Sequence, residues 1–128
     1  MAKHVLTRLA VSLASLLTAL ASGAEEQIPS IRHTVFFELR HAPGSSDEAE
    51  FFARAAVLAE IPDVHEFRRV EEISQKNPYQ HGLLMTFESP AAYARYNEHP
   101  AHLEFVEEFW IPNVTRFIEL DFVAPPNP

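Results

Sequence analysis

The sequence contains no cysteine and only three glycines in 128 residues. Without cysteine, the chain can form neither a structural disulfide nor a lipid-modified amino-terminal cysteine, so it permits an oxidising compartment without requiring one. It also lacks a glycine-rich phosphate-binding loop and any internal repeat. These absences exclude disulfide scaffolds, cysteine-anchored lipoproteins, P-loop proteins and repeat arrays.

Positive charge is also scarce, because ten lysines and arginines stand against eighteen acidic residues, which gives a formal net charge of −8. Two of the basic residues, Lys3 and Arg8, fall in a segment that we expect to be removed, and the remaining chain carries about −10. An acidic surface argues against non-specific binding to nucleic acid or to anionic lipid. We therefore expect neither nucleic acid nor a membrane among the partners of the mature protein.

Residues 1–24 have the order of a secretory signal peptide, in which basic residues precede an apolar run and small residues that end at Ala24. The apolar run is shorter than the roughly 20 residues that span a bilayer, so a retained membrane helix is the weaker alternative. Cleavage after Ala24 predicts a secreted or periplasmic protein. After it we expect a short linker at 25–30, one small domain at 31–123 and a proline-rich tail at 124–128.

Alternation and helical periodicity predict one α+β domain. Ser45 with Glu48 and Ser89 with Pro90 are typical of helix starts, and Pro100 is expected to end or kink a helix. In chain order we expect a strand at 31–39, a helix at 45–61, an edge strand at 64–73, a strand at 81–88, a helix at 89–97, a helical segment after Pro100 that Pro112 stops, and a closing strand at 117–123. This order predicts a ferredoxin-like βαββαβ sandwich.

Helices cover only one face of the sheet in such a fold, and the other face of this sheet would be apolar. The first strand carries phenylalanine on both faces, at Phe36 and Phe37. If alternation holds, the uncovered face combines Phe36, Leu84, Ile118, Leu120 and Phe122. A patch of that size is typical of an interface, so we expect a homodimer whose two sheets pack together as a dimeric α+β barrel.

The segment 96–102 is the strongest sign of a functional site, because it sets one tyrosine and two histidines around Pro100, just before an apolar helix. Two more histidines, His33 and His81, lie near the starts of predicted strands, and Asp121 lies inside the last one. Polar side chains in otherwise apolar elements indicate a pocket for a small molecule. They do not identify that molecule.

Five short motifs follow one another along the domain: Ile31-Arg32-His33-Thr34-Val35-Phe36-Phe37, Ile61-Pro62, Thr86-Phe87-Glu88-Ser89, Tyr96-x-x-His99-Pro100-x-His102 and Asp121-Phe122. Together they resemble the stress-responsive A/B barrel domain family, often called Dabb. The similarity covers nearly all of residues 31–123, and the Tyr-x-x-His-Pro-x-His motif is its most specific part. The resemblance implies a dimeric α+β barrel. Its best understood members are cofactor-free plant polyketide cyclases of the olivetolic acid cyclase type, in which a histidine and tyrosine pocket performs an aldol condensation.

The resemblance to these cyclases falls on five side chains of this sequence: His33, His81, Tyr96, His102 and Asp121. It implies that they belong to one catalytic pocket that works without a cofactor. The sequence departs from the cyclases at the first helix, where Ala55 stands in place of a pocket tyrosine. This departure leaves the substrate open, while the chemistry of His102 stays possible.

The residues themselves suggest a role for this set. A histidine on the apolar stripe of a helix needs a hydrogen-bond partner when it is buried. We expect Asp121 to accept a hydrogen bond from one ring nitrogen of His102, which leaves the other nitrogen free as a general base beside a carbonyl group. Tyr96, His33 or His81 could hold the developing enolate oxygen. In the alternative, these side chains only form hydrogen bonds with one another and hold the helix against the sheet.

Three classes of function therefore compete. The first is a secreted, cofactor-free enzyme of the cyclase or lyase type that acts on a small carbonyl or aromatic compound; the second is a non-catalytic binding or stress-associated module; the third is a related barrel that uses oxygen or haem. Export would keep the protein from the cytosolic thioesters that cyclases use. We expect no metal, because the spacing of His99 and His102, with a proline between them, is unlike the i, i+4 pair that ligates one ion from a helix.

Overall fold

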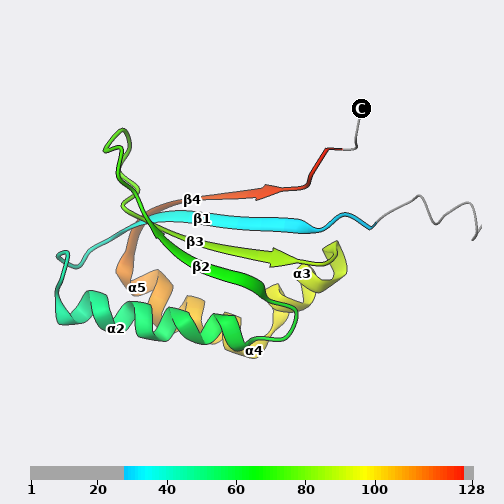
Figure 1. Ribbon diagram of the computed structural model, residues 1–128. Helices are drawn as coiled ribbons and strands as arrows, with labels where there is room; N and C mark the ends of the chain where they lie inside the picture. The colour runs from blue at the N-terminus through cyan, green and yellow to red at the C-terminus, as the bar shows by residue number, and fades with distance from the viewer. Residues whose placement is uncertain (1–27, 126–128) are drawn as a thin grey trace, which may run out of the picture.

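The computed structural model describes residues 28–125, which form a four-stranded sheet and a layer of helices (Figure 1). The predicted leader at 1–24 and parts of the predicted linker and tail lie outside these residues. In chain order the elements are β1 (Ile31–Leu39), α2 (Ser46–Ala55) with a 3₁₀ turn (Ala56–Glu60), β2 (His65–Glu71), β3 (His81–Phe87), α3 (Pro90–Glu98), α4 (Pro100–Phe105) with a π-helical turn (Val106–Trp110), α5 (Ile111–Asn113) and β4 (Val114–Phe122).

The sheet is antiparallel throughout and has the strand order β2-β3-β1-β4. β1 lies between β3 and β4, which agrees with its apolar side chains on both faces, and β2 is an edge strand as predicted. The register places His33 of β1 opposite Met85 of β3 and opposite Asp121 of β4. These features confirm the predicted ferredoxin-like α+β fold.

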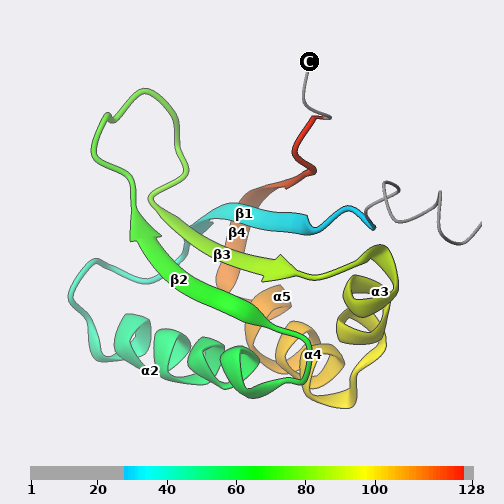
Figure 2. The same ribbon diagram turned by 45° about the vertical axis from the view of Figure 1, so that its right-hand side comes forward.

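All the helices lie on one face of the sheet (Figures 1 and 2). Between the two layers is a core in which Phe37 and Phe87 are fully buried. The strands contribute Val35, Phe37, Leu39, Leu83, Met85 and Phe87 to it, and the helical segments contribute Phe51, Phe52, Ala55, Leu58, Tyr96 and Phe105. Because strand side chains alternate between faces, His33 and His81 also point into this layer, and both are buried.

Two serines begin helices as the sequence predicts. The Ser45 hydroxyl accepts a hydrogen bond from the Glu48 N–H at 3.2 Å, and the Ser89 hydroxyl accepts one from the Ala92 N–H at 3.1 Å. These bonds satisfy donors that the first helical turn leaves free. Pro90 follows Ser89 in the first turn of α3, where its missing N–H has no cost.

The prediction for Pro112 is wrong, since this residue does not stop the helix. α4 continues through the π-helical turn into α5, and Pro112 lies inside α5. β4 then begins at Val114, ahead of the predicted start at 117. Proline lacks the N–H that would bond to the carbonyl four residues before it. In the π-helical turn the hydrogen bonds run between residues five apart, so the usual helical pairing is already changed just before Pro112.

The face of the sheet opposite the helices is left uncovered by residues 28–125 (Figure 1). On the described part of this face, Ile118, Leu120 and Phe122 of β4 are 37%, 40% and 52% exposed, and Phe36 and Leu84 are half-buried beside them. The predicted apolar patch is therefore present. Within the same residues, no helix is long and apolar enough to cross a membrane.

Gly82 of β3 lies within this uncovered face, between Phe36 of β1 and Val70 of β2. A Cβ atom at this position would come within 2.7 Å of the Phe36 Cδ1 and within 2.7 Å of the Val70 Cγ2. Such distances are far below van der Waals contact, so the absence of a Cβ atom at Gly82 lets the Phe36 ring lie across β3.

Candidate functional site

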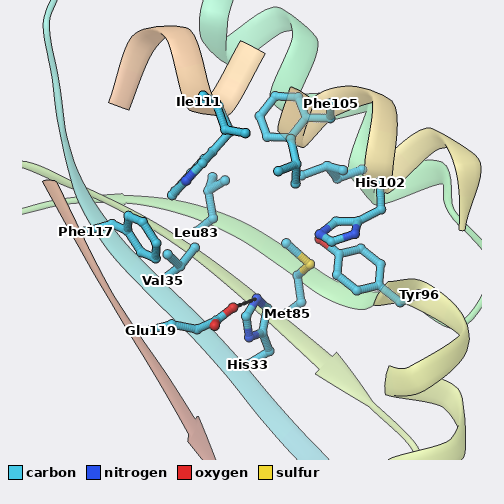
Figure 3. Close-up of a pocket in the computed structure, with 13 residues that line it drawn as sticks. His33, Val35, Leu83, Met85, Tyr96, His102, Phe105, Ile111, Phe117 and Glu119 are labelled. Atoms are coloured by element: carbon cyan, nitrogen blue, oxygen red, sulfur yellow. Dashed lines mark ion pairs between the residues drawn. The ribbon is translucent and has the colours of Figure 1, made fainter. Parts of the chain in front are cut away.

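A cavity of about 300 Å³ lies between the sheet and the helical segment from α4 to α5 (Figure 3). Most of its wall is apolar and comes from Val35, Leu58, Leu83, Met85, Phe105, Val106, Trp110, Ile111 and Phe117. Four polar side chains complete the lining: His33, Tyr96, His102 and Glu119. An apolar cavity with a few fixed polar groups is typical of a site for a small molecule.

His33 is oriented by Asp121, which lies directly opposite it on β4. The His33 Nδ1 donates a hydrogen bond of 2.6 Å to the Asp121 Oδ1. The Tyr93 hydroxyl, which comes from α3, donates to the Asp121 Oδ2 at 3.1 Å and lies 3.0 Å from the His33 Nδ1. Because the carboxylate accepts the hydrogen bond from Nδ1–H, the Nε2 of a neutral His33 carries a lone pair.

This arrangement corrects the predicted pairing of Asp121 with His102. Residues opposite each other on neighbouring strands have Cβ atoms only about 5 Å apart, so the strand register decides which histidine the carboxylate reaches. His102 instead donates its Nδ1 proton to the backbone carbonyl of Asn97, at 3.0 Å. A carbonyl oxygen can only accept, so the Nε2 of neutral His102 is unprotonated. His102 therefore has the free ring nitrogen that was expected, but the Asn97 carbonyl fixes its tautomer in place of Asp121.

His102 lies against the buried ring of Tyr96, with 4.4 Å between the ring centroids. In Figure 3 the imidazole extends from its helix toward the cavity. Burial lowers the pKa of His102, and the nearby His33 and His99 act in the same direction, which outweighs the opposing effects of the Asn97 carbonyl and Glu119. The ring is therefore neutral at physiological pH and offers a basic nitrogen.

Tyr96 is only 2% exposed, and burial raises its pKa well above the usual value for a phenol. The negative environment of Glu119 and the neighbouring Tyr93 add to this rise. Tyr96 therefore stays protonated and can donate a hydrogen bond into the cavity. Burial and Asp121 likewise raise the pKa of Tyr93, which keeps its hydroxyl a donor to the carboxylate.

Glu119 enters the cavity from β4, two residues before Asp121 on the same face of the strand. Its Oε1 lies 3.7 Å from the His33 Nε2, which is an ion-pair distance but too long for a hydrogen bond. Figure 3 marks this contact with a dashed line between the Glu119 carboxylate and the His33 ring. The Glu119 side chain is about half exposed, so the cavity is open along β4.

His81 was expected in the same pocket, and the structure corrects this prediction. It points into the core on the same face of the sheet as His33. However, its partner on β1 is Phe37, which is four residues, or about 13 Å, along the strand from His33. Its Nδ1 donates to the Glu71 Oε2 at 2.8 Å, and its Nε2 lies 3.7 Å from the Glu48 Oε2. This separate cluster joins β2, β3 and α2, away from the cavity lining.

Other predicted details have structural roles. His99 caps α4, because its Nδ1 accepts a hydrogen bond from the Ala101 N–H at 3.1 Å. Ala55 is buried in the core and does not line the cavity. From this part of the chain, Leu58 contributes to the cavity wall. Across residues 28–125, no group of three or more histidine and acidic side chains is arranged to hold a metal ion.

Sequence reasoning missed two members of the site, Tyr93 and Glu119. Both could have been found from spacing. Tyr93 precedes Tyr96 by three residues and so lies on the same side of a helix. Glu119 precedes Asp121 by two residues and so lies on the same face of a strand.

Comparison with known proteins agrees with this fold. The Stress responsive A/B Barrel Domain family matches residues 31–124. A solved Dabb family protein with a ferredoxin-like fold from Mesorhizobium loti is 42% identical, covers 77% of this chain and 99% of its own, and gives a TM-score of 0.75. No curated protein matches the chain.

Two enzymes share the fold at lower identity. Hydroxynitrile lyase from Passiflora edulis is 20% identical, covers 77% of this chain and 95% of its own, and gives a TM-score of 0.67. SnoaB, a cofactor-independent oxygenase from Streptomyces nogalater, is 16% identical, covers 77% and 96% of the two chains, and gives a TM-score of 0.59. Three further structures, all of ferredoxin-like proteins, are described as dimeric.

The family match extends from the start of β1 past the end of β4, and it includes every side chain of the cavity. The structure also has the α+β architecture of the matched proteins. The chain therefore belongs to the stress-responsive A/B barrel domain family.

Proposed function

We propose that this protein is a cofactor-free acid–base enzyme that acts on a small carbonyl or aromatic compound in the cavity. The observation that carries the proposal is the hydrogen bond from the His102 Nδ1 to the Asn97 carbonyl. It fixes the tautomer in which Nε2 is free, inside a cavity whose wall is mostly apolar. A neutral imidazole held in this way is a competent general base.

In the proposed step, the His102 Nε2 removes a proton from the carbon next to a carbonyl group. The electron pair of the broken C–H bond forms the enolate, whose oxygen accepts a hydrogen bond from the Tyr96 hydroxyl. Tyr96 suits this role because its raised pKa keeps it protonated. The imidazolium then returns the proton to the product. His33, held by Asp121 and Tyr93, supplies a second polar contact with the compound.

The two enzymes that share the fold provide an analogy for chemistry in this kind of site. One is described as a hydroxynitrile lyase and the other as a cofactor-independent oxygenase. Oxygen-dependent turnover is therefore the second candidate. A binding module without turnover is the third, and the largely apolar cavity wall supports ligand binding in every case.

We also propose that the protein is an exported homodimer joined through the uncovered face of the sheet. The exposed apolar side chains of β4 support this assembly, since a monomer would leave them in water. The dimeric state described for similar ferredoxin-like proteins supports it as well. Export rests on the order of basic, apolar and small residues in the leader.

The test is exchange of α-protons for deuterium in D₂O, followed by NMR with phenylacetaldehyde and acetophenone as probes. His102→Ala should slow exchange by about 10²- to 10⁴-fold, because acid–base groups typically contribute that much. Tyr96→Phe should also slow it. His65→Ala removes an exposed histidine that does not line the cavity, and it should leave the rate unchanged.

Thermal unfolding of each variant separates loss of chemistry from loss of fold. Exchange by His102→Ala at the wild-type rate would remove His102 as the base. Binding of the probes without exchange would identify a binding module, and turnover that requires air would identify an oxygenase.

A further inference from the structure

The polar end of the cavity carries negative charge. Glu119 is the one acidic side chain in the described lining, and that lining contains no lysine or arginine. Asp121 adds a second carboxylate directly behind His33, where it is bonded to Nδ1. The described lining thus has one carboxylate, a second carboxylate lies behind His33, and no lysine or arginine is present in the wall.

In the part of the chain that the structure describes, Glu119 has an ion-pair contact with His33 and none with a lysine or arginine. Burial lowers the pKa of His102, so this ring is neutral at physiological pH. His33 donates its Nδ1–H to Asp121 at 2.6 Å, and its Nε2 lies 3.7 Å from the Glu119 Oε1, which is too long for a hydrogen bond. Arg116 is on the same strand as Glu119 but three positions before it, so it lies on the opposite face of the sheet.

We propose that Glu119 makes this cavity selective for compounds whose polar group is uncharged or cationic, such as a carbonyl or an amine, and excludes carboxylates and phosphate esters. The inference rests on the proposed function, since it concerns the compound bound in the same cavity. An anion beside Glu119 would lose its water without gaining a lysine or arginine partner, and it would meet a like charge nearby. A neutral carbonyl needs only the Tyr96 hydroxyl as a donor.

The test uses three probes with one shape and different charges: benzaldehyde, benzoate and benzylamine. Binding to the full chain is measured at neutral pH and low salt by calorimetry, and the histidine ring NMR signals locate each probe. We expect benzoate to bind at least about tenfold more weakly than benzaldehyde, because like charges repel strongly in a partly buried site. Glu119→Gln should narrow this difference to a few-fold and should leave benzaldehyde nearly unchanged.

Two further variants make the result specific. Glu119→Asp keeps the charge and should keep the discrimination against benzoate. Glu104→Gln removes one charge from an exposed residue of α4 that does not line the cavity, and it should behave as the wild type for all three probes.

Benzoate binding as tight as that of benzaldehyde in the wild type would overturn the inference, and so would discrimination that survives in Glu119→Gln. Either result leaves the cavity as a ligand site and the proposed function standing. If none of the three probes perturbs the cavity histidines at millimolar concentration, both this inference and the proposed function fail.

Discussion

Two histidines in the cavity have their ring protons fixed by acceptors of different kinds. The acceptor for His33 is the carboxylate of Asp121, and the acceptor for His102 is the backbone carbonyl of Asn97. A carboxylate can be changed by mutation, whereas a backbone carbonyl stays in place. The two imidazoles can therefore be perturbed independently.

The first prediction concerns Asp121→Asn. The amide can present either an oxygen or an N–H to His33, so the His33 Nδ1 loses its obligatory acceptor and its tautomer should change. The signals of His102 should stay as in the wild type, because its partner is untouched. Long-range ¹H–¹⁵N NMR of the imidazole rings measures both effects.

Tyr93→Phe is the matched control, since it removes one hydrogen bond to Asp121 and keeps the ring. It should alter His33 less than Asp121→Asn does, at a cost of about 0.5–1.5 kcal/mol in unfolding free energy. A change in the His102 tautomer in Asp121→Asn would contradict the hydrogen-bond arrangement described above.

The second prediction is a pH dependence that belongs to His102. Its pKa is lowered by burial from the usual value near 6.5, so the unfolded chain takes up the proton first as the pH falls. Stability from this group is therefore intact above pH 6.5, declines as the pH falls from 6.5 to the folded pKa, and then levels off. Activity that needs the free Nε2 should persist below pH 6.5.

Titration of the His102 ring by NMR checks the midpoint, and denaturant unfolding at several pH values checks the stability. His102→Asn should lose this part of the pH dependence. A midpoint at or above 6.5 would contradict the prediction.

The sequence predicts some members of the site and misplaces others, because several contacts depend on which residues of neighbouring strands lie opposite each other. His33, Tyr96 and His102 were predicted to share a pocket because the resemblance to the cyclases falls on them, and all three line the cavity. The partner of Asp121 depends on the register between β1 and β4, which are the first and last strands in the sequence. His81 was assigned to the pocket through the same resemblance, and its position on β3 places its β1 partner four residues from His33.

At the scale of elements, the break at His99 and Pro100 shapes the site. It ends α3 and begins α4 with a side-chain cap, so the chain changes direction between Tyr96 and His102. The two rings then meet at a centroid distance of 4.4 Å, although they belong to different helices. The sequence predicts this break from proline alone, whereas the π-helical turn before Pro112 has no comparable signal.

The third prediction concerns packing between strands. Gly82→Ala should destabilise the protein by about 1–3 kcal/mol, because the new methyl group would overlap Phe36 and Val70. Phe36→Leu removes part of that overlap. In the Phe36→Leu background, Gly82→Ala should therefore cost less than in the wild type, as measured by urea unfolding in a double-mutant cycle. Strict additivity of the two changes would show that the predicted overlap is relieved elsewhere.

At the scale of the whole molecule, the fourth prediction is that Leu120→Glu dissociates or unfolds the protein. A carboxylate in the uncovered face would be buried against the partner sheet at a cost on the order of several kcal/mol. Sedimentation at micromolar concentration should give twice the monomer mass for the wild type. Leu103→Glu is the matched control, because Leu103 is exposed on the helical layer. A stable monomeric wild type would reject the dimer.

The fifth prediction concerns export. If residues 1–24 are a signal peptide, protein purified from its native host should begin close to Glu25, because the small residues before it form the cleavage site. Mass spectrometry of the intact protein measures the amino terminus. Recovery of the full-length chain from the cytoplasm would exclude export.

β4 presents a different set of side chains on each face. Phe117, Glu119 and Asp121 belong to the cavity side, while Ile118, Leu120 and Phe122 alternate with them on the uncovered face. A partner sheet that holds this edge strand would thus also hold the carboxylates of the site. If the proposed activity and dimer are both correct, the specific activity should fall when the protein is diluted below the dissociation constant of the dimer, and it should recover on concentration.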